Sequence, residues 1–215
     1  MSKLARVHRA FGIILLIPFL AWAVTGFIFF IKPGYGAAYE TLVAKTYPLD
    51  AQTVVRSDPA WFEYRVLKTI LGTHLITKDS NGWHHLDVTA MQPRSQPSHD
   101  ELKLLLNDAF TANPERYGRV ASVSNEPAAI TAVSTTGIKI TFDWTRMSLQ
   151  QKGEDTDRID LLYRIHYLQW TGNRVFDRIL GLSGLGGVII LALLGARLAF
   201  RASRGGDRPD RDRSA

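Results

Sequence analysis

The chain has 215 residues and contains no cysteine, so disulfide frameworks, thiolate zinc sites, iron–sulfur clusters and cysteine nucleophiles are excluded. Its length corresponds to one or two domains. The formal net charge of +6 is of the kind found in nucleic-acid-binding proteins, but its distribution argues against such a partner. Residues 1–9 and 197–215 hold nine basic and three acidic residues, and the charges of the remaining chain cancel.

An uncharged apolar run lies directly inside each of these basic ends. The first run covers residues 10–31 and the second covers residues 179–196. As a helix with about 1.5 Å of rise per residue, the first run is about 33 Å long, which is enough to cross a hydrocarbon core of about 30 Å. Leu198 and Phe200 extend the second run. We therefore expect transmembrane helices over 10–31 and 179–200.

The basic ends also predict the orientation of these helices, because positive residues accumulate on the cytoplasmic side of a membrane. We expect residues 1–9 and 201–215 in the cytoplasm and residues 32–178 outside it. A cleaved signal peptide is an alternative for the first run, since Gly36–Ala38 resembles a processing site. The apolar part of a signal peptide has only about 7–15 residues, however, and this run has 22.

The segment between the two helices is predicted to form a small α+β domain over residues 60–146. Ser98 and Glu101 have the spacing of a capping box at the start of a helix, and Asn81-Gly82 is a strong hairpin signal. The apolar face expected for this helix consists of Leu102, Leu105, Leu106 and Phe110. Strands are expected at about 65–71, 73–78, 83–91, 119–124, 130–134 and 138–144.

Connecting segments are expected on both sides of this domain. Residues 32–59 form a linker to the first transmembrane helix. Residues 147–178 form a polar linker, followed by an amphipathic helix that starts near Arg158 and leads into the second transmembrane helix. The apolar side chains of the amphipathic helix recur at spacings of three residues. They are Ile159, Leu162, Ile165 and Leu168.

The sequence contains none of the common catalytic signatures, such as G-x-S-x-G, H-E-x-x-H, a Walker A loop or a dinucleotide-binding fingerprint. We therefore predict no catalytic residue and no metal site, and we do not expect a stand-alone enzyme. Small residues in the second apolar run are expected to let helices approach one another closely. They are Ser183, Gly184, Gly187, Ala192 and Ala196.

Several histidines lie in the predicted domain. His84 and His85 are neighbours in a predicted strand, where their side chains point to opposite faces and cannot easily share a metal ion. With Asn81-Gly82 as the turn, we expect Asp79 to face His84 and to hold it by a hydrogen bond. For His74 we expect no notable neighbour.

The other two histidines of interest, His8 and His166, lie at the predicted membrane boundaries. His8 comes two residues before the first apolar run, and His166 lies on the amphipathic helix before the second. Titratable side chains at such positions are candidates for a functional role. The alternative is that both simply occupy the headgroup region of the membrane.

Five short strings of residues resemble one known family, the PepSY-associated transmembrane proteins. They are His8-Arg9-x-x-Gly12, Pro18-Phe19-Leu20-x-Trp22-x-x-Thr25-Gly26, Lys32-Pro33-Gly34-Tyr35, Asp160-Leu161-Leu162 through His166, and Thr171-Gly172-Asn173 with the glycine-rich run that follows. The resemblance implies a bacterial inner-membrane protein with a PepSY-like α+β domain in the periplasm. Some members of the family reduce ferric siderophores and bind b-type haem through histidines in their helices, which implies haem ligation by His8 and His166.

The membrane positions of these histidines limit how haem can bind. In one chain His8 and His166 would lie about 30 Å apart, on opposite sides of the membrane, so they cannot ligate the same iron. A parallel homodimer would instead bring two His8 together at the inner leaflet and two His166 together at the outer leaflet. Such a dimer would hold one haem in each leaflet.

On this basis the function expected is membrane electron transfer with b-type haem, linked to the reduction of ferric iron or another metal, by a dimer or with a protein partner. Two alternatives remain. The chain could be a non-catalytic accessory subunit of a larger respiratory or redox complex in the membrane. It could also be a membrane-anchored periplasmic module that binds or regulates another protein.

Overall fold

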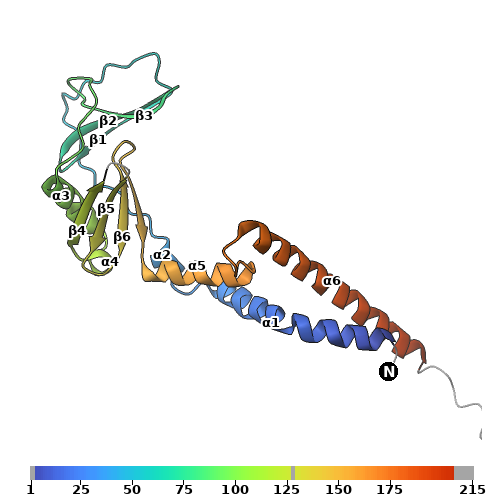
Figure 1. Cartoon of the computed structure of the whole chain (residues 1–215). Coiled ribbons are helices and arrows are strands. Elements are labelled where there is room, and N and C mark those ends of the chain that lie inside the picture. The colour runs from blue at the N-terminus through green and yellow to red at the C-terminus, as the bar shows by residue number, and fades with distance from the viewer. Residues whose placement is uncertain (1–2, 127–128, 206–215) are drawn as a thin grey trace, which may run out of the picture. The chain divides into compact units, whose positions relative to one another are not determined.

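The computed structural model describes residues 3–126 and 129–205 (Figure 1). The chain divides into two compact units. One, called the helical unit below, consists of Met1–Pro33 and Ile159–Ala215, and the other, called the sheet unit, consists of Gly34–Arg158. The expected layout of two terminal apolar helices around a central region with β-sheets is therefore present.

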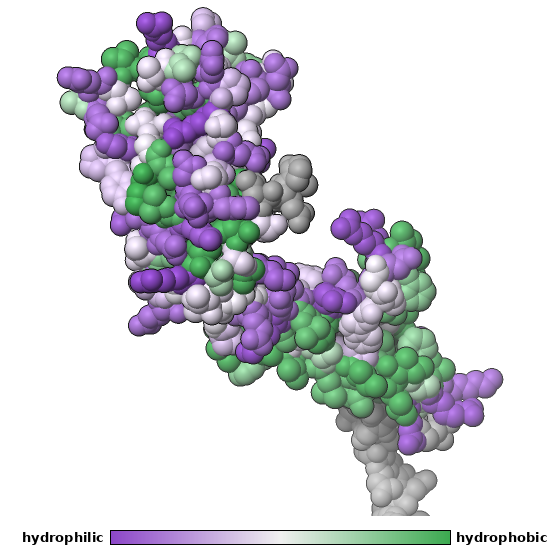
Figure 2. Space-filling view, turned by 60° about the vertical axis from the view of Figure 1, so that its left-hand side comes forward, coloured by the Kyte–Doolittle hydropathy of each residue, from purple (hydrophilic) through white to green (hydrophobic). Residues whose placement is uncertain are grey.

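The long helices of the helical unit are α1 (Lys3–Ile31) and α6 (Arg174–Gly205). Both are long and apolar enough to cross a membrane. Large apolar side chains cover their outward sides, and Ile17, Phe30 and Leu193 are 72%, 87% and 66% exposed. Figure 2 shows hydrophobic residues gathered over these helices. An apolar surface of this extent is unusual for a soluble monomer and fits a lipid environment.

On the inward side of α1, buried and partly buried residues recur at intervals of three and four residues. Leu15 and Thr25 are buried on this side, and Trp22 and Phe29 are partly buried. Intervals that average 3.5 residues are typical of helices that pack at a small crossing angle. In Figure 1, α1 and α6 accordingly run side by side in opposite directions.

The helix α5 (Glu154–His166) ends in a turn that buries a leucine in the helical unit. The backbone N–H of Gln169 donates to Arg164 O at 2.8 Å and that of Leu168 donates to Ile165 O at 3.2 Å, which is the Schellman pattern. The left-handed position of this motif usually holds glycine, but here it is Leu168, with φ of 54°. The backbone strain costs about 1–2 kcal/mol, and burial of the leucine side chain offsets it by a similar amount.

The sheet unit contains two antiparallel sheets, and in each the strands follow one another in chain order. The three-stranded sheet consists of β1 (Glu63–Thr69), β2 (Gly72–Asp79) and β3 (Gly82–Leu86). The four-stranded sheet consists of β4 (Val120–Glu126), β5 (Ala129–Ser134), β6 (Lys139–Asp143) and β7 (Ser148–Lys152). The helices of this unit are α2 (Tyr35–Ala38), α3 (His99–Phe110) and α4 (Pro114–Tyr117).

The helix α3 starts as predicted. Ser98 Oγ accepts a hydrogen bond from the backbone N–H of Glu101 at 3.3 Å, and Glu101 Oε2 accepts one from the backbone N–H of Ser98 at 2.8 Å. These two bonds complete the capping box. The predicted apolar face of α3 is buried in the core of the sheet unit. Its residues Leu102, Leu105, Leu106 and Phe110 are at most 1% exposed.

The hairpin between β2 and β3 is shifted by one residue from the prediction. Asp79 pairs with Gly82, so that Thr77, and not Asp79, lies opposite His84. Asp79 Oδ1 accepts a hydrogen bond from the backbone N–H of Asn81 at 2.7 Å, and Gly82 has a φ of 122°, which favours glycine. The expected contact still forms diagonally, because Asp79 Oδ1 lies 3.0 Å from His84 Nε2.

The sheet unit extends beyond residues 60–146 on both sides. Strand β7 lies where the sequence predicts a linker, and Leu149 is its only large apolar residue, so its alternation is hard to recognise. On the other side, Ala38 and Leu42 are only 2% and 3% exposed, although the sequence places them in a linker. Helix α5 also begins earlier than the sequence predicts.

Arg116, in α4, connects the two ends of the sheet unit. Its side chain is 10% exposed, and its Nη1 and Nη2 donate to Asp155 Oδ2 and to Gln151 Oε1, each at 2.8 Å. Its Nε lies 3.9 Å from Glu40 Oε2. The hydrogen bond from the guanidinium group lowers the pKa of the Asp155 carboxyl below its usual value.

The residues around Arg116, called the Arg116 cluster below, also hold the backbone at the start of the unit. Gln151 Nε2 donates to Ala38 O at 2.8 Å and to Glu40 O at 3.2 Å. Thr156 Oγ1 donates to Ala38 O at 3.2 Å. The chain therefore enters and leaves the sheet unit side by side. The cluster consists of Ala38, Glu40, Arg116, Gln151, Asp155 and Thr156.

Replacing Arg116 should loosen both ends at once. We expect Arg116→Ala to lower the free energy of unfolding by about 2–4 kcal/mol, because it leaves partly buried carboxylates without their cation. Urea unfolding of the full chain in detergent measures this loss. Arg119→Ala, at an exposed position nearby, is the control and should cost less than about 0.5 kcal/mol. Equal losses in the two variants would contradict the role of the cluster.

A buried chain of hydrogen bonds joins the three-stranded sheet to the segment after β6. Thr69 Oγ1 lies 2.7 Å from His74 Nε2, His74 Nδ1 lies 2.9 Å from His85 Nε2, and His85 Nδ1 lies 2.9 Å from Trp144 O. His74 and His85 are 0% and 5% exposed. The expectation that His74 has no notable neighbour is therefore wrong, because the register of β2 and β3 puts both rings on one face.

The donor and the acceptor of each hydrogen bond in this series can be assigned by starting from the carbonyl of Trp144. Trp144 O can only accept, so His85 Nδ1 carries a proton and, in a neutral ring, His85 Nε2 accepts. His74 Nδ1 must then donate, and His74 Nε2 accepts from the hydroxyl of Thr69. The same hydroxyl oxygen accepts from the backbone N–H of Leu71 at 3.1 Å. With both rings neutral, each of their nitrogens therefore has a partner.

This network makes the stability of the sheet unit depend on pH. Burial, together with the charge of Arg94, lowers the pKa of His74 to about 3, and burial lowers the pKa of His85 to about 4. In the unfolded chain both groups titrate near 6.5. The unfolded state therefore binds more protons between pH 6.5 and about 4. Lowering the pH through this range reduces the free energy of unfolding by up to about 3 kcal/mol per pH unit.

Urea unfolding of the full chain between pH 7.5 and 4.5, followed by tryptophan fluorescence, measures this slope. Above pH 7 the contribution of the two histidines should be constant. The variant His85→Gln should remove about half of the slope, because one of the two titrating groups is gone. A slope unchanged in this variant would show that other groups cause it.

Candidate functional site

The helical unit contains a groove with a volume of about 1270 Å³. It lies among α1, the segment 164–172 and the first turns of α6. Trp22, Leu182 and Leu185 contribute apolar surface, and His166 is the one imidazole among the lining residues. The volume exceeds the roughly 300–1,000 Å³ of most small-molecule sites, so the groove is large enough for an extended ligand.

Hydrogen bonds determine which nitrogen of His166 carries a proton. The hydroxyl of Thr25 donates to Ala21 O at 2.6 Å, and its oxygen lies 2.8 Å from His166 Nδ1. Because this hydroxyl has only one proton, it accepts from His166 Nδ1–H. The lone pair of neutral His166 is then on Nε2. Trp22 Nε1 donates to His166 O at 2.5 Å, and the ring of Phe29 meets the His166 ring edge-on, with centroids 5.1 Å apart.

His8 lies at the opposite end of the pair of helices, against a glycine of α6. A Cβ atom added to Gly195 would lie 3.2 Å from His8 Cε1, so the ring occupies the space that a side chain would need. His8 Nδ1 is buried and makes no hydrogen bond with any residue that the structure describes. Such an atom has free capacity to bind a ligand or an additional hydrogen-bond donor.

The small residues predicted to pack helices fall on two sides of α6. A Cβ atom at Gly184 would lie 3.0 Å from Leu168 Cδ1, and one at Gly187 would lie 3.1 Å from Leu15 Cδ1. These two glycines therefore permit the close approach of α1 and of the turn after α5. The other three predicted residues lie on exposed sides of α6. They are Ser183, Ala192 and Ala196.

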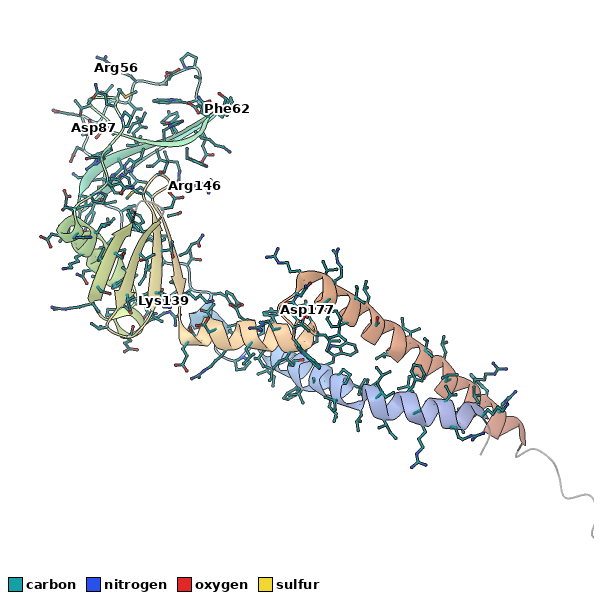
Figure 3. All side chains as sticks on the ribbon, in the orientation of Figure 1. Arg56, Phe62, Asp87, Lys139, Arg146 and Asp177 are labelled. Atoms are coloured by element: carbon teal, nitrogen blue, oxygen red, sulfur yellow. The ribbon has the colours of Figure 1, made fainter. Side chains whose placement is uncertain are left out.

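Three arginines also line the groove, Arg164 from α5 and Arg174 and Arg178 from the start of α6. All three are exposed, and none forms an ion pair with another of the residues 3–126 and 129–205. The one carboxylate of the groove, Asp177 (labelled in Figure 3), is 7% exposed and accepts hydrogen bonds from Thr171 N at 3.0 Å and Thr171 Oγ1 at 2.7 Å. Asp177 Oδ1 is thus hydrogen-bonded within the loop that precedes α6.

The string Thr171-Gly172-Asn173 has a structural role at the start of α6. Asn173 Oδ1 accepts from the backbone N–H of Val175 at 3.0 Å, which caps the helix. Gly172 has a φ of 76°, in the left-handed region that favours glycine. Thr171 connects this turn to Asp177. The cap explains the string without a ligand, so the string by itself does not indicate a binding site.

Comparison of the chain with models of protein families, with curated proteins and with solved structures finds no match. Nothing in these comparisons indicates membership of the PepSY family. Among residues 3–126 and 129–205, no group of three His, Asp or Glu side chains lies close enough together to hold a metal ion. What the site can do is therefore argued from its own geometry.

The sequence analysis identified His166 but not the groove around it. Trp22 and Thr25 are part of the strings noted above, although nothing in their spacing predicts that they bind His166. Arg174 and Arg178 are separated by four residues and so lie on one side of α6. This spacing is a signal that the sequence already contains, but the position of Arg164 beside them depends on the turn at Leu168.

The glycines of α6 provide a matched test of helix packing. We expect Gly187→Leu to separate α1 from α6 and to lower the thermal unfolding temperature, because its Cβ would lie against Leu15. Gly186→Leu is the control, since a Cβ atom there meets nothing within 4 Å. Circular dichroism of both variants in detergent makes the comparison. The packing described would be contradicted if both variants unfolded at the temperature of the unmodified protein.

Proposed function

We propose that this protein is a membrane-anchored electron-transfer protein of the PepSY type that carries b-type haem on His166. In this proposal α1 and α6 cross the inner membrane of a bacterium. Both ends of the chain lie in the cytoplasm, and residues 32–178 lie in the periplasm. The excess of basic residues at the outer ends of both apolar runs supports this orientation.

The observation that carries the proposal is the hydrogen bond between His166 and Thr25. A histidine that ligates a metal through Nε2 usually donates its Nδ1–H to a fixed acceptor, which sets the orientation of the ring and makes Nε2 more basic. Thr25 is such an acceptor, at 2.8 Å from His166 Nδ1. Axial ligation of haem iron needs a neutral imidazole with its lone pair on the free nitrogen.

The other residues of the groove fit the same role. Trp22 donates a hydrogen bond to the backbone carbonyl of His166, and the ring of Phe29 contacts the His166 ring, so both limit how this residue can move. Haem, when bound, supplies transfer of one electron through its iron. The chain's own contribution is to orient His166 and to place the group at the membrane boundary.

A second ligand would come from a second copy of the chain. A parallel dimer would pair His166 with His166 near the periplasm and His8 with His8 near the cytoplasm. The buried His8 Nδ1, which has no partner among the residues that the structure describes, supports a site at the second position as well. Electrons could then pass between the two leaflets toward a ferric or other metal acceptor in the periplasm.

A second candidate function is that of an accessory subunit in a larger membrane complex. The exposed small residues on α6 favour it, because small residues let a helix of another protein approach closely. These residues are Ser183, Ala192 and Ala196. A periplasmic binding or regulatory module is the third reading, and the compact sheet unit is compatible with it.

The visible spectrum of the protein, purified in mild detergent from haem-replete cells, tests the first proposal. We expect a Soret band with the spectrum of six-coordinate low-spin haem. His166→Ala and His8→Ala should each remove part of this absorbance, and His99→Ala, at an exposed position of the sheet unit, should remove none. Thr25→Val should weaken haem binding about 10–100-fold, because it removes the acceptor for His166 Nδ1–H. Absence of a Soret band would favour the accessory-subunit function.

The proposed orientation has its own test. Protease added to spheroplasts with an intact inner membrane should cut within residues 34–158 and spare both ends of the chain. A tag placed after residue 215 reports on the C-terminal end. Removal of this tag from outside would overturn the orientation, whatever the outcome of the haem experiment.

A further inference from the structure

The three arginines of the groove lack a function in the haem proposal. Arg164, Arg174 and Arg178 bring three guanidinium groups to one groove, and the structure describes no carboxylate paired with any of them. Like charges that are gathered in one place repel one another unless an anion lies among them. Asp177 is the one carboxylate among the lining residues, and its Oδ1 accepts two hydrogen bonds from Thr171, so it offsets only one of the three positive charges.

The surroundings of the arginines limit what the anion can be. The uncharged apolar run of α6 begins directly after Arg178, and Val175, Leu182 and Leu185 line the same groove. A ligand that matches both the arginines and the apolar lining residues has an anionic group at one end and an apolar body at the other. The groove is also wide enough for an extended molecule, at about 1270 Å³.

The proposed orientation of the helices adds a further argument. In the proposed topology these arginines lie at the periplasmic end of α6, the side on which basic residues next to a transmembrane helix are disfavoured. Arginine binds phosphate oxygens through paired N–H groups, and this geometry suits a phosphodiester better than a single point charge would.

From these observations we infer that the groove binds an anionic phospholipid of the surrounding leaflet. Its phosphate lies among Arg164, Arg174 and Arg178, and its acyl chains lie along the apolar residues of α6. The inference rests on the proposed location of α1 and α6 in a membrane, but it does not depend on haem. Bound lipid would neutralise the arginines and fill the groove beside Leu182 and Leu185.

Binding of lipid to the full-length protein in detergent tests this inference. The probe is phosphatidylglycerol, compared with phosphatidylcholine, and native mass spectrometry counts the molecules bound at increasing lipid concentration. We expect the unmodified protein to retain phosphatidylglycerol in preference to phosphatidylcholine. The triple variant Arg164→Gln/Arg174→Gln/Arg178→Gln should bind phosphatidylglycerol about 100-fold more weakly, from the usual contribution of each basic residue at an anionic surface.

Two further variants separate charge from folding and from position. Arg164→Lys/Arg174→Lys/Arg178→Lys keeps the charge and should retain most of the preference for phosphatidylglycerol. Arg197→Gln/Arg201→Gln removes charges at the other end of the same helix, and it should leave binding unchanged. A preference that disappears equally in this control, or that is absent from the unmodified protein, would overturn the inference.

The visible spectrum of the same samples distinguishes the lipid from haem. If the glutamine triple variant loses its Soret band while it retains phosphatidylglycerol, the arginines bind the carboxylates of haem and the lipid inference is wrong. If the protein shows no Soret band but binds phosphatidylglycerol through the arginines, the haem proposal fails and the lipid inference stands.

Discussion

The guanidinium group of Arg116 determines where the sheet unit begins and where it ends. It holds the carboxylate of Asp155 and the side-chain amide of Gln151, and that amide in turn holds the backbone of Ala38. Arginine is suited to this position because its planar fork of donors cannot lose its charge and can satisfy several acceptors at once. The cluster adds polar contacts to the hydrophobic core, which also contains Leu42 from the start of the unit and Leu149 from its end. With the cluster, the chain returns to the place at which it entered, which is what a domain inserted between two antiparallel helices requires.

The histidines of this protein differ in their chemistry because they differ in their hydrogen bonds. His74 and His85 have partners on both ring nitrogens, so they are structural links between a sheet and the segment that follows β6. His166 lines a groove, and among the residues that the structure describes only its Nδ1 has a hydrogen-bond partner. The residue type is the same in each case. The number of partners, and not the presence of an imidazole, therefore separates the candidate ligand from the structural pair.

The features that the sequence predicts well are those that depend on neighbours along the chain. The length and polarity of two apolar runs are sufficient for α1 and α6, and the spacing of Ser98 and Glu101 is sufficient for the start of α3. Contacts between distant segments could not be predicted in this way. The pairing of His74 with His85 depends on the register of a hairpin, which Gly82 moves by one residue from the simplest reading. Strand β7 has a single large apolar residue, Leu149, and is a strand because β6 lies beside it.

The candidate site shows the same limit. His166 is recognisable from its place before an apolar run, but its partner Thr25 lies 141 residues away, and Arg164 reaches the groove only after a sharp turn. These residues lie near one another in the structure, but the sequence gives no local pattern that brings them together. Only the spacing of Arg174 and Arg178 on one side of α6 could have indicated the groove in advance.

Leu168 has a consequence for the order in which the helical unit forms. Its left-handed backbone conformation is unfavourable for a leucine as long as the side chain is in water, and it becomes favourable only when the side chain lies against Gly184. The turn after α5 and the packing of α6 thus stabilise each other through this contact. A glycine at position 168 would form the turn earlier and would make it independent of α6. The leucine instead couples the two, so that the turn beside the groove is most stable when its side chain lies against α6.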